Sequence, residues 1–296
     1  MDFEQDLIRI ATEGLSQYGM RVDDAASGDG LLHRWVNVQL KLIPRMPRKV
    51  ELSPRIPSSL DAIRRSTDRE LARQSLETIC KRARTGDDLN PYLSKSVVKE
   101  DYTDALFADW GVYHLHLNEI AEGEYFASRS DYWLFAIFPA ERALLVDVRR
   151  HDTTDLLQRN LLEIVNSTWP EALATHRLVG ITGQTRDTAS PVTIRMFRKA
   201  GINAVQTIGS QVDAPPGGGL TTARTSVRVR IETDRLVFAA REATARATEH
   251  TEEIRADIET HGMKPPHVLD LHLVLHEDQF LILERTTGWA RPLFEP

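Results

Sequence analysis

The chain has 296 residues, 41% hydrophobic and 27% charged, which excludes a wholly disordered chain and a small disulfide-stapled scaffold. Its net charge of -6 argues against a protein that coats nucleic acid by bulk charge, and its one cysteine, Cys80, excludes an internal disulfide. Residues 1–10 lack the pattern of a signal peptide, and no apolar run approaches the roughly 20 residues of a membrane-spanning helix. We therefore expect a soluble, cytoplasmic enzyme or binding protein.

Residues 1–57 are predicted to form a helix-strand unit. Apolar residues recur at helical spacing over residues 3–15, and residues 31–43 have the composition of a strand. Four prolines between Pro44 and Pro57 exclude a central strand or a long helix there. We therefore expect a linker that ends near residue 57.

Residues 58–170 are predicted to form a central domain. Residues 60–84 have helical spacing of apolar residues and end before Gly86, which predicts a helix or a helix pair. Three short runs, rich in aromatic and β-branched residues, are typical of an antiparallel meander. These runs are residues 111–117, 132–138 and 143–148. A further helix is expected to begin at Asp152 or Thr153.

Residues 171–296 are predicted to form a C-terminal α/β domain. Residues 177–182, 192–200 and 203–208 follow a strand, helix and strand pattern. Residues 221–261 predict a long helix, which is either unbroken and able to pair with a second copy of the chain, or broken near Thr233 or Thr248. A hairpin around Glu277 and Asp278 closes the chain. The predicted fold class is α+β, with a small antiparallel sheet in the centre.

The first strand of the meander places two histidines on one face of the sheet. His114 and His116 are two residues apart and share this face with Val112, while Leu115 lies on the opposite, apolar face. Two neutral imidazoles suit general base and general acid chemistry, or the binding of one metal ion. The alternative is that they cover a solvent-facing sheet without a chemical role.

Basic residues are expected to converge on the same edge of the sheet. The third strand of the meander runs into Arg149, Arg150 and His151, and Arg129 comes just before the second strand. Guanidinium groups stabilise charge on phosphoryl oxygens, so this cluster suits catalysis on a phosphodiester. The alternative is an exposed basic turn. We expect a concave site with both strand histidines and at least one of these four residues, above a buried Leu115.

Two features outside the central sheet offer further candidates. The backbone N–H groups of Gly217, Gly218 and Gly219, before a predicted helix, form either an anion-binding site or a connector. His272 and His276 have the same parity in the terminal hairpin and are either metal ligands or structural residues.

The order of elements in residues 60–165 carries a resemblance to a known family. A helix ending at Gly86, a loop with Tyr92-Leu-Ser-Lys95 and the strand Gly111-Val-Tyr-His-Leu-His-Leu117 precede the strands Asp131-Tyr-Trp-Leu-Phe-Ala-Ile137 and Ala143-Leu-Leu-Val-Asp-Val148. This order resembles the RelE/ParE class of bacterial toxins. In that family a helical hairpin precedes a small antiparallel sheet, whose first meander strand often reads Gly-x-Tyr-Arg-Leu-Arg.

The resemblance implies a metal-independent endoribonuclease of toxin or phage-defence type, which needs no cofactor and activates the ribose 2′-hydroxyl of RNA. The candidate catalytic residues are His114, His116, Arg129, Arg149, Arg150 and His151. One alternative is a non-catalytic RelE-like module that binds nucleic acid or a protein partner, such as an antitoxin-like protein or a defence-complex subunit. Another is a metal-dependent nuclease that uses the three histidines.

Overall fold

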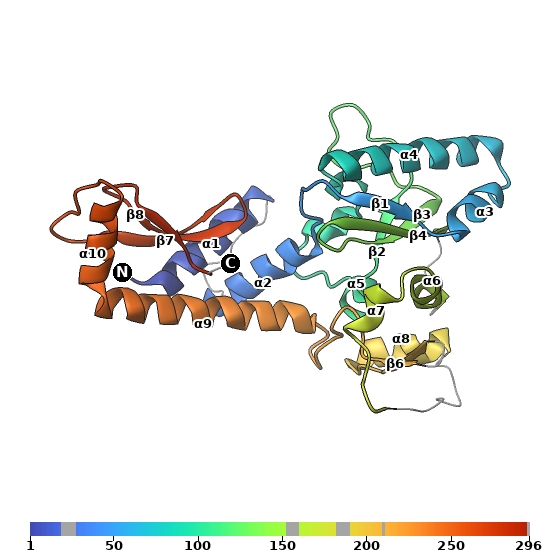
Figure 1. The fold of residues 1–296 in the computed structure, drawn as a ribbon. Coiled ribbons are helices and arrows are strands. Elements are labelled where there is room, and N and C mark those ends of the chain that lie inside the picture. The colour runs from blue at the N-terminus through green and yellow to red at the C-terminus, as the bar shows by residue number, and fades with distance from the viewer. Residues whose placement is uncertain (19–27, 152–159, 182–189, 209–210, 295–296) are drawn as a thin grey trace. The chain divides into compact units, whose positions relative to one another are not determined.

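The computed structural model describes residues 1–18, 28–151, 160–181, 190–208 and 211–294, and these form two compact units. Unit 1 consists of residues 1–39 and 229–296, and unit 2 of residues 40–228 (Figure 1). Both contain helices and small sheets, so the fold class is α+β. The two ends of the chain thus belong to the same compact unit, whereas the sequence suggested three consecutive domains.

Unit 1 is built on a three-stranded antiparallel sheet of order β7-β8-β9, which comprises β7 (Leu271–His276), β8 (Gln279–Glu284) and β9 (Ala290–Pro292). The predicted hairpin is confirmed: Glu277 and Asp278 both have positive φ, as a two-residue hairpin turn requires. The predicted long helix is broken at His250 into α9 (Val227–Glu249) and α10 (Thr251–Thr260). This break lies near Thr248, as one of the two alternatives expected.

The predicted strand at residues 31–43 is wrong, because the chain forms helix α2 (Gly28–Lys41) there, after α1 (Phe3–Gln17). Leu31 and Leu32 are buried, and so are Trp35 and Val36 one turn later. This three-to-four-residue spacing is that of a buried helical face. The aromatic and β-branched composition of the segment suggested a strand, but the spacing of its buried residues is that of a helix.

Unit 2 contains a four-stranded sheet of order β1-β4-β3-β2. The meander of β2 (Tyr113–His116), β3 (Tyr132–Ile137) and β4 (Arg142–Arg150) is antiparallel, as predicted. The expected linker instead holds β1 (Lys49–Leu52), which pairs in parallel with β4. The prolines flank β1 rather than interrupt it, and β1 is an edge strand, so the segment can join the sheet.

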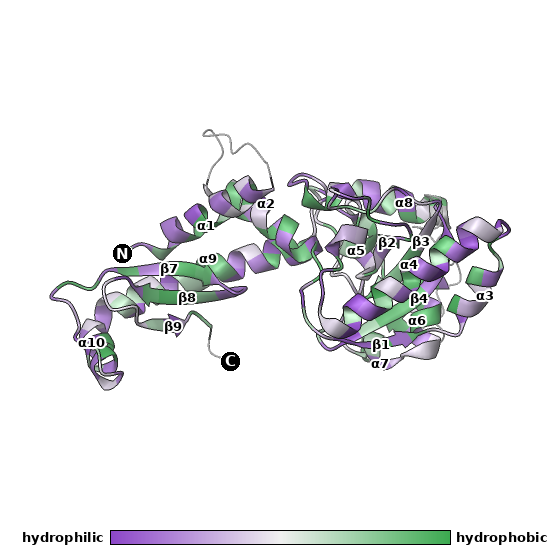
Figure 2. Cartoon of the chain, turned by 90° about the horizontal axis from the view of Figure 1, so that it is seen from above, coloured by the Kyte–Doolittle hydropathy of each residue, from purple (hydrophilic) through white to green (hydrophobic). Residues whose placement is uncertain are grey.

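Helices cover both faces of this sheet (Figure 1). On one face, α3 (Arg55–Asp61) and α4 (Ser66–Thr85) pack against Leu115 and Leu134. The helix predicted within residues 60–84 is α4, whereas most of α3 lies before that range. On the other face, α5 (Ala105–Trp110) and α6 (Asn160–Thr168) pack against Trp133 and Phe135. Figure 2 shows the hydrophobic colouring along β4 and α6. The sheet therefore separates two hydrophobic cores, one on each of its faces.

Four elements of unit 2 follow α6: α7 (Glu171–Ala174), α8 (Pro191–Ala200), β5 (Gln206–Ile208) and β6 (Gln211–Asp213). Two short 3-10 turns, at Asn90–Tyr92 and Lys95–Val98, lie between α4 and α5. The helix predicted at residues 192–200 is confirmed, but residues 177–181 form no strand beyond an isolated bridge from Arg177 to Asp213. The predicted helix start at Asp152 or Thr153 lies outside the described residues.

Among the helices that the structure describes, none combines the length and apolar character needed to cross a bilayer.

Candidate functional site

The register of β2 is as predicted, but the histidine face is not open. Leu115 is 0% exposed and faces the core under α3 and α4. His114 and His116 lie on the other face, yet each is only 8% exposed, because Trp133 and the helices on that face cover them. Both imidazoles are therefore largely buried, and the alternative in which they cover a solvent-facing sheet is wrong. The concave site stays a prediction.

Three histidines surround the indole of Trp133, and we call these four residues the histidine cluster. The Trp133 ring centre lies 5.0 Å from that of His114, 6.4 Å from that of His116 and 3.9 Å from that of His151. The rings of His116 and His151 stack with centres 6.0 Å apart. The strand end of β4 thus brings His151 to the β2 histidines, as the sequence predicted.

Burial and nearby charge lower the pKa values of His116 and His151. For His116 burial is the largest cause, and together with the electrostatic effect of His114, His151 and Arg129 it lowers the pKa to about 4. Burial also lowers the pKa of His151, and Arg129 and His114 act in the same direction. The backbone N–H of Ser130 lies 3.5 Å from Nδ1 of His116, which leaves that imidazole as an acceptor. A buried neutral imidazole is a proton acceptor at neutral pH.

The predicted basic residues divide between two places. Arg129 is exposed and close enough to the cluster for its charge to act on His116 and His151. Arg149 lies over the Phe135 ring, and its Nε donates to Oδ2 of the buried Asp147 across 2.9 Å. Arg150, on the opposite side of β4, is exposed. Arg129 and His151 therefore join the strand histidines, whereas Arg149 and Arg150 line a neighbouring groove.

A buried lysine that was not predicted lies next to the cluster. Lys41 is only 4% exposed, and its Nζ donates to the carbonyl oxygens of Lys99 and Tyr102 across 2.8 and 2.6 Å. Burial lowers its pKa to about 8, against the opposing effect of nearby carboxylates. Lys41, Asp104 and His114 line one small cavity of about 10 Å³. Residues 31–43 were predicted to be a strand, so nothing placed Lys41 in the interior.

Asp104 connects this cavity to α5. Its Oδ1 accepts from the backbone N–H groups of Leu106 and Phe107, and its Oδ2 lies 3.4 Å from Nδ1 of His114. Aspartate just before an apolar helical turn is a typical N-cap, a signal present in the sequence. The carboxylate therefore both starts α5 and faces the first strand histidine.

A buried ion pair joins α8 to α5 on the covered face of the sheet. Nε of Arg198 donates to Oδ2 of Asp109 across 3.0 Å, and the guanidinium lies 4.6 Å from the ring centre of Trp110. Both side chains are about nine-tenths buried. Burial raises the pKa of Asp109, and Arg198 opposes that rise.

The glycine loop predicted to bind an anion uses its N–H groups within the protein. Gly217 donates to the carbonyl of Asp109, Gly218 to that of Pro215 and Gly219 to that of Ala108, at 2.8 to 2.9 Å. None of the three N–H groups is left for an anion. The structure therefore supports the alternative, a connector packed against α5.

Replacing Gly217 by alanine is expected to destabilise the protein by about 1–3 kcal/mol, because the new Cβ would overpack a closed site. That atom would lie 2.3 Å from the backbone oxygen of Phe107 and 2.5 Å from that of Ala108. Urea denaturation measures the loss. Gly123→Ala is the control, since nothing lies within 4 Å of its Cβ and only positive φ strains it. Equal losses at both positions would refute the close approach.

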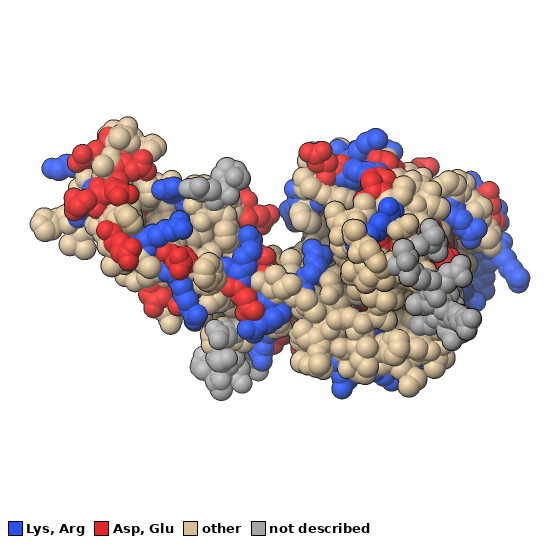
Figure 3. All heavy atoms as spheres, turned by 60° about the horizontal axis from the view of Figure 1, so that its bottom comes forward, with Lys and Arg blue, Asp and Glu red and all other residues tan. Residues whose placement is uncertain are grey.

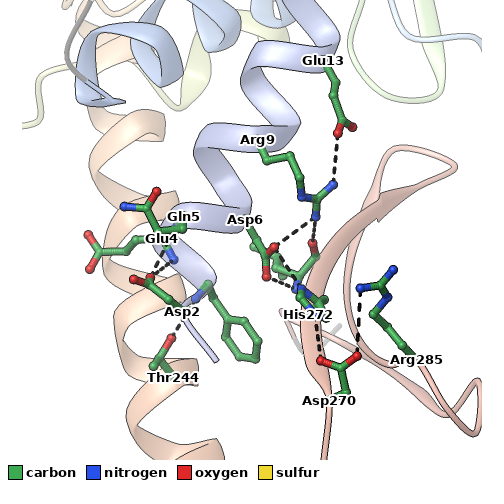
Figure 4. Close-up of polar contacts among 12 residues, drawn as sticks. Asp2, Glu4, Gln5, Asp6, Arg9, Glu13, Thr244, Asp270, His272 and Arg285 are labelled. Atoms are coloured by element: carbon green, nitrogen blue, oxygen red, sulfur yellow. Dashed lines mark hydrogen bonds and ion pairs between the residues drawn. The ribbon is translucent and has the colours of Figure 1, made fainter.

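His272, the other candidate metal ligand, is held between carboxylates in unit 1 (Figure 4). Its Nδ1 lies 3.3 Å from Oδ1 of Asp6, and its Nε2 lies 3.0 Å from Oδ1 of Asp270. Asp6 also accepts from the backbone N–H of Leu273. His276 is exposed, and no group of three metal-ligating side chains gathers within the described ranges. These contacts support the structural alternative, in which His272 ties α1 to β7.

Comparison of the chain with protein-family models, curated proteins and solved structures found no match.

Proposed function

We propose that unit 2 is a RelE-like domain that cleaves RNA as a metal-independent endoribonuclease of toxin or phage-defence type. The observation that carries this proposal is the stacked pair of His116 and His151, both with lowered pKa values, beside Arg129. The order of elements supports it too, since the helix pair α3–α4 precedes the antiparallel strands β2, β3 and β4.

The proposed reaction is an attack of the ribose 2′-oxygen on the adjacent phosphorus. Neutral His116 takes the 2′-hydroxyl proton while the new O–P bond forms, and the protonated fraction of His151 donates a proton to the leaving 5′-oxygen. Arg129, whose charge acts on both imidazoles, stabilises the negative charge on the phosphorane. The products are a 2′,3′-cyclic phosphate and a 5′-hydroxyl end. His114 positions the cluster through Trp133 and Asp104.

The test is incubation of purified protein with RNA in EDTA. We expect cleavage with cyclic-phosphate ends, and a loss of about 10²-fold or more in His116→Gln and in His151→Gln, because each removes a proton-transfer group. His276→Gln, at an exposed position of unit 1, is the control. Circular dichroism checks that the variants fold. Cleavage at the wild-type rate by the double variant His116→Gln plus His151→Gln would refute the proposal. Loss of activity in EDTA would favour a metal-dependent nuclease.

The burial of the strand histidines favours one second candidate, a non-catalytic RelE-like module that binds RNA or a protein partner. With His114 and His116 each 8% exposed, little of either imidazole is open to a substrate. This candidate predicts that RNA incubated with the protein stays intact. A protein partner would then be of the antitoxin-like or defence-complex type.

A further inference from the structure

A basic groove lies at the end of β4, between the start of α3 and the start of α6. Its volume is about 340 Å³, and its charged and polar lining residues are Arg55, Ser59, Asp147, Arg149, Arg150 and Asn160. Arg55 starts α3, and Arg149 and Arg150 end β4. The groove therefore forms where a helix start and a strand end meet.

Among the residues that the structure describes, the one carboxylate that lines the groove is already engaged. Asp147 is 2% exposed, and its Oδ1 accepts from Oγ of Ser59 across 2.5 Å and from the N–H of Val148 across 2.9 Å. Its Oδ2 accepts from Nε of Arg149. Asp147 thus fixes α3 and Arg149 in place, so it shapes the wall of the groove rather than neutralising its rim.

The rim of the groove carries arginines that have no carboxylate partner among the described residues. Arg55 and Arg150 are exposed, and neither makes an ion pair or a side-chain hydrogen bond with any residue that the structure describes. Arg64 and Arg65, which follow the groove residue Ile63, are exposed and equally unpaired within those residues. In Figure 3, Lys and Arg gather at the right edge, where α3 lies in Figure 1. Such a local gathering of like charge, in a chain of net charge -6, suits a polyanion.

The groove is continuous along the chain with the histidine cluster. Arg150 pairs with Tyr132 across the strands, and the next residue, His151, donates its backbone N–H to the carbonyl of Asp131 across 2.6 Å. The groove and the cluster therefore meet at two adjacent residues, Arg150 and His151. Arginine binds phosphate oxygens in a bidentate manner.

We infer that the groove binds the phosphodiester backbone of single-stranded RNA, on nucleotides that flank the bond cleaved at the histidine cluster. This inference rests on the proposed function for its substrate class. It adds Arg55, Ser59 and Asn160 to the interface, together with the rim arginines of the α3–α4 connection. It also assigns Arg150 to backbone binding.

The test measures binding apart from cleavage, with a fluorescent single-stranded 2′-O-methyl RNA that has no 2′-hydroxyl to attack. Fluorescence anisotropy at several salt concentrations gives the affinity and its salt dependence. We expect Arg55→Gln plus Arg150→Gln to weaken binding at least tenfold and to lower the slope of log K against log salt by about 1.4, or 0.7 per lost phosphate contact. The control, Lys81→Gln plus Lys95→Gln, removes the same charge from exposed positions of unit 2.

Equal weakening by both double variants, or no weakening by the groove variant, would overturn the inference. Competition by polyglutamate as strong as that by RNA of equal charge would overturn it in favour of an acidic protein partner. Failure of the proposed function looks different. If RNA binds with the expected dependence on the groove arginines but is never cleaved, the inference about the groove stands. Only the proposed nuclease activity is then refuted.

Discussion

Lowering the pH from 6.5 to 4 is expected to destabilise unit 2 by roughly 3 kcal/mol through His116 alone, at 1.36 kcal/mol per pKa unit. The pKa of His116 falls from its ordinary value of 6.5 to about 4 in the folded protein. Between these values the unfolded chain binds more protons than the folded one, so acid favours unfolding. The lowered pKa of His151 acts in the same direction.

Hydrogen exchange of the β3 and β4 amides, corrected for the intrinsic pH dependence of exchange, measures this loss in unit 2. In His116→Gln the side chain no longer titrates, so the dependence on pH between 4 and 6.5 should become clearly shallower. His276→Gln, at an exposed position, should retain the wild-type slope. An unchanged slope in His116→Gln would show that His116 is not held neutral in the fold.

Replacing Arg198 by methionine is expected to destabilise unit 2 by about 3–5 kcal/mol at neutral pH, because it leaves the buried carboxylate of Asp109 without its partner. Burial already raises the pKa of Asp109, and the loss of Arg198 removes the opposing effect. The folded variant should therefore bind a proton at Asp109. As a result, the loss of stability should be smaller at pH 5 than at pH 8.

Urea denaturation of wild type and variant at both pH values measures this difference. The matched variant is Arg198→Met with Asp109→Leu, in which neither charge is buried. Because an apolar pair of similar volume often replaces a buried ion pair without loss, we expect this double variant to recover most of the stability. A loss that is the same at both pH values and persists in the double variant would indicate damage to packing instead.

The parts of the fold that were predictable have a strong local signal. The alternation of Tyr113, His114, Leu115 and His116 fixed which side chains share a face, and the structure retains that register. Glu277 and Asp278 marked the hairpin turn, and Gly86 ends α4 in the left-handed conformation that glycine favours.

The parts that were not predictable depend on tertiary contacts. Two-residue alternation cannot show whether a helix will cover the second face, and α5 and α6 turned an expected surface into a core. Composition misled at residues 31–43, where Trp35 and Val36 favoured a strand but pack as a helical face. The burial of Lys41 was missed together with this helix. It also depends on carbonyl groups about 60 residues further along the chain, which no local pattern reveals.

The division of the chain into units also bears on the order in which its parts fold. Unit 2 is one continuous segment, so all of its contacts are available once residue 228 has left the ribosome. Unit 1 needs both of its segments: Arg9 donates to the carbonyl of Leu273, and Leu273 donates its N–H to Asp6. Contacts between these two segments close a large loop, and closing a flexible loop costs entropy that rises with its length. Because unit 2 lies between the segments in the chain, its prior folding shortens the flexible part of the loop and lowers this cost. Synthesis therefore favours formation of the sheet with the histidine cluster before α1 meets β7.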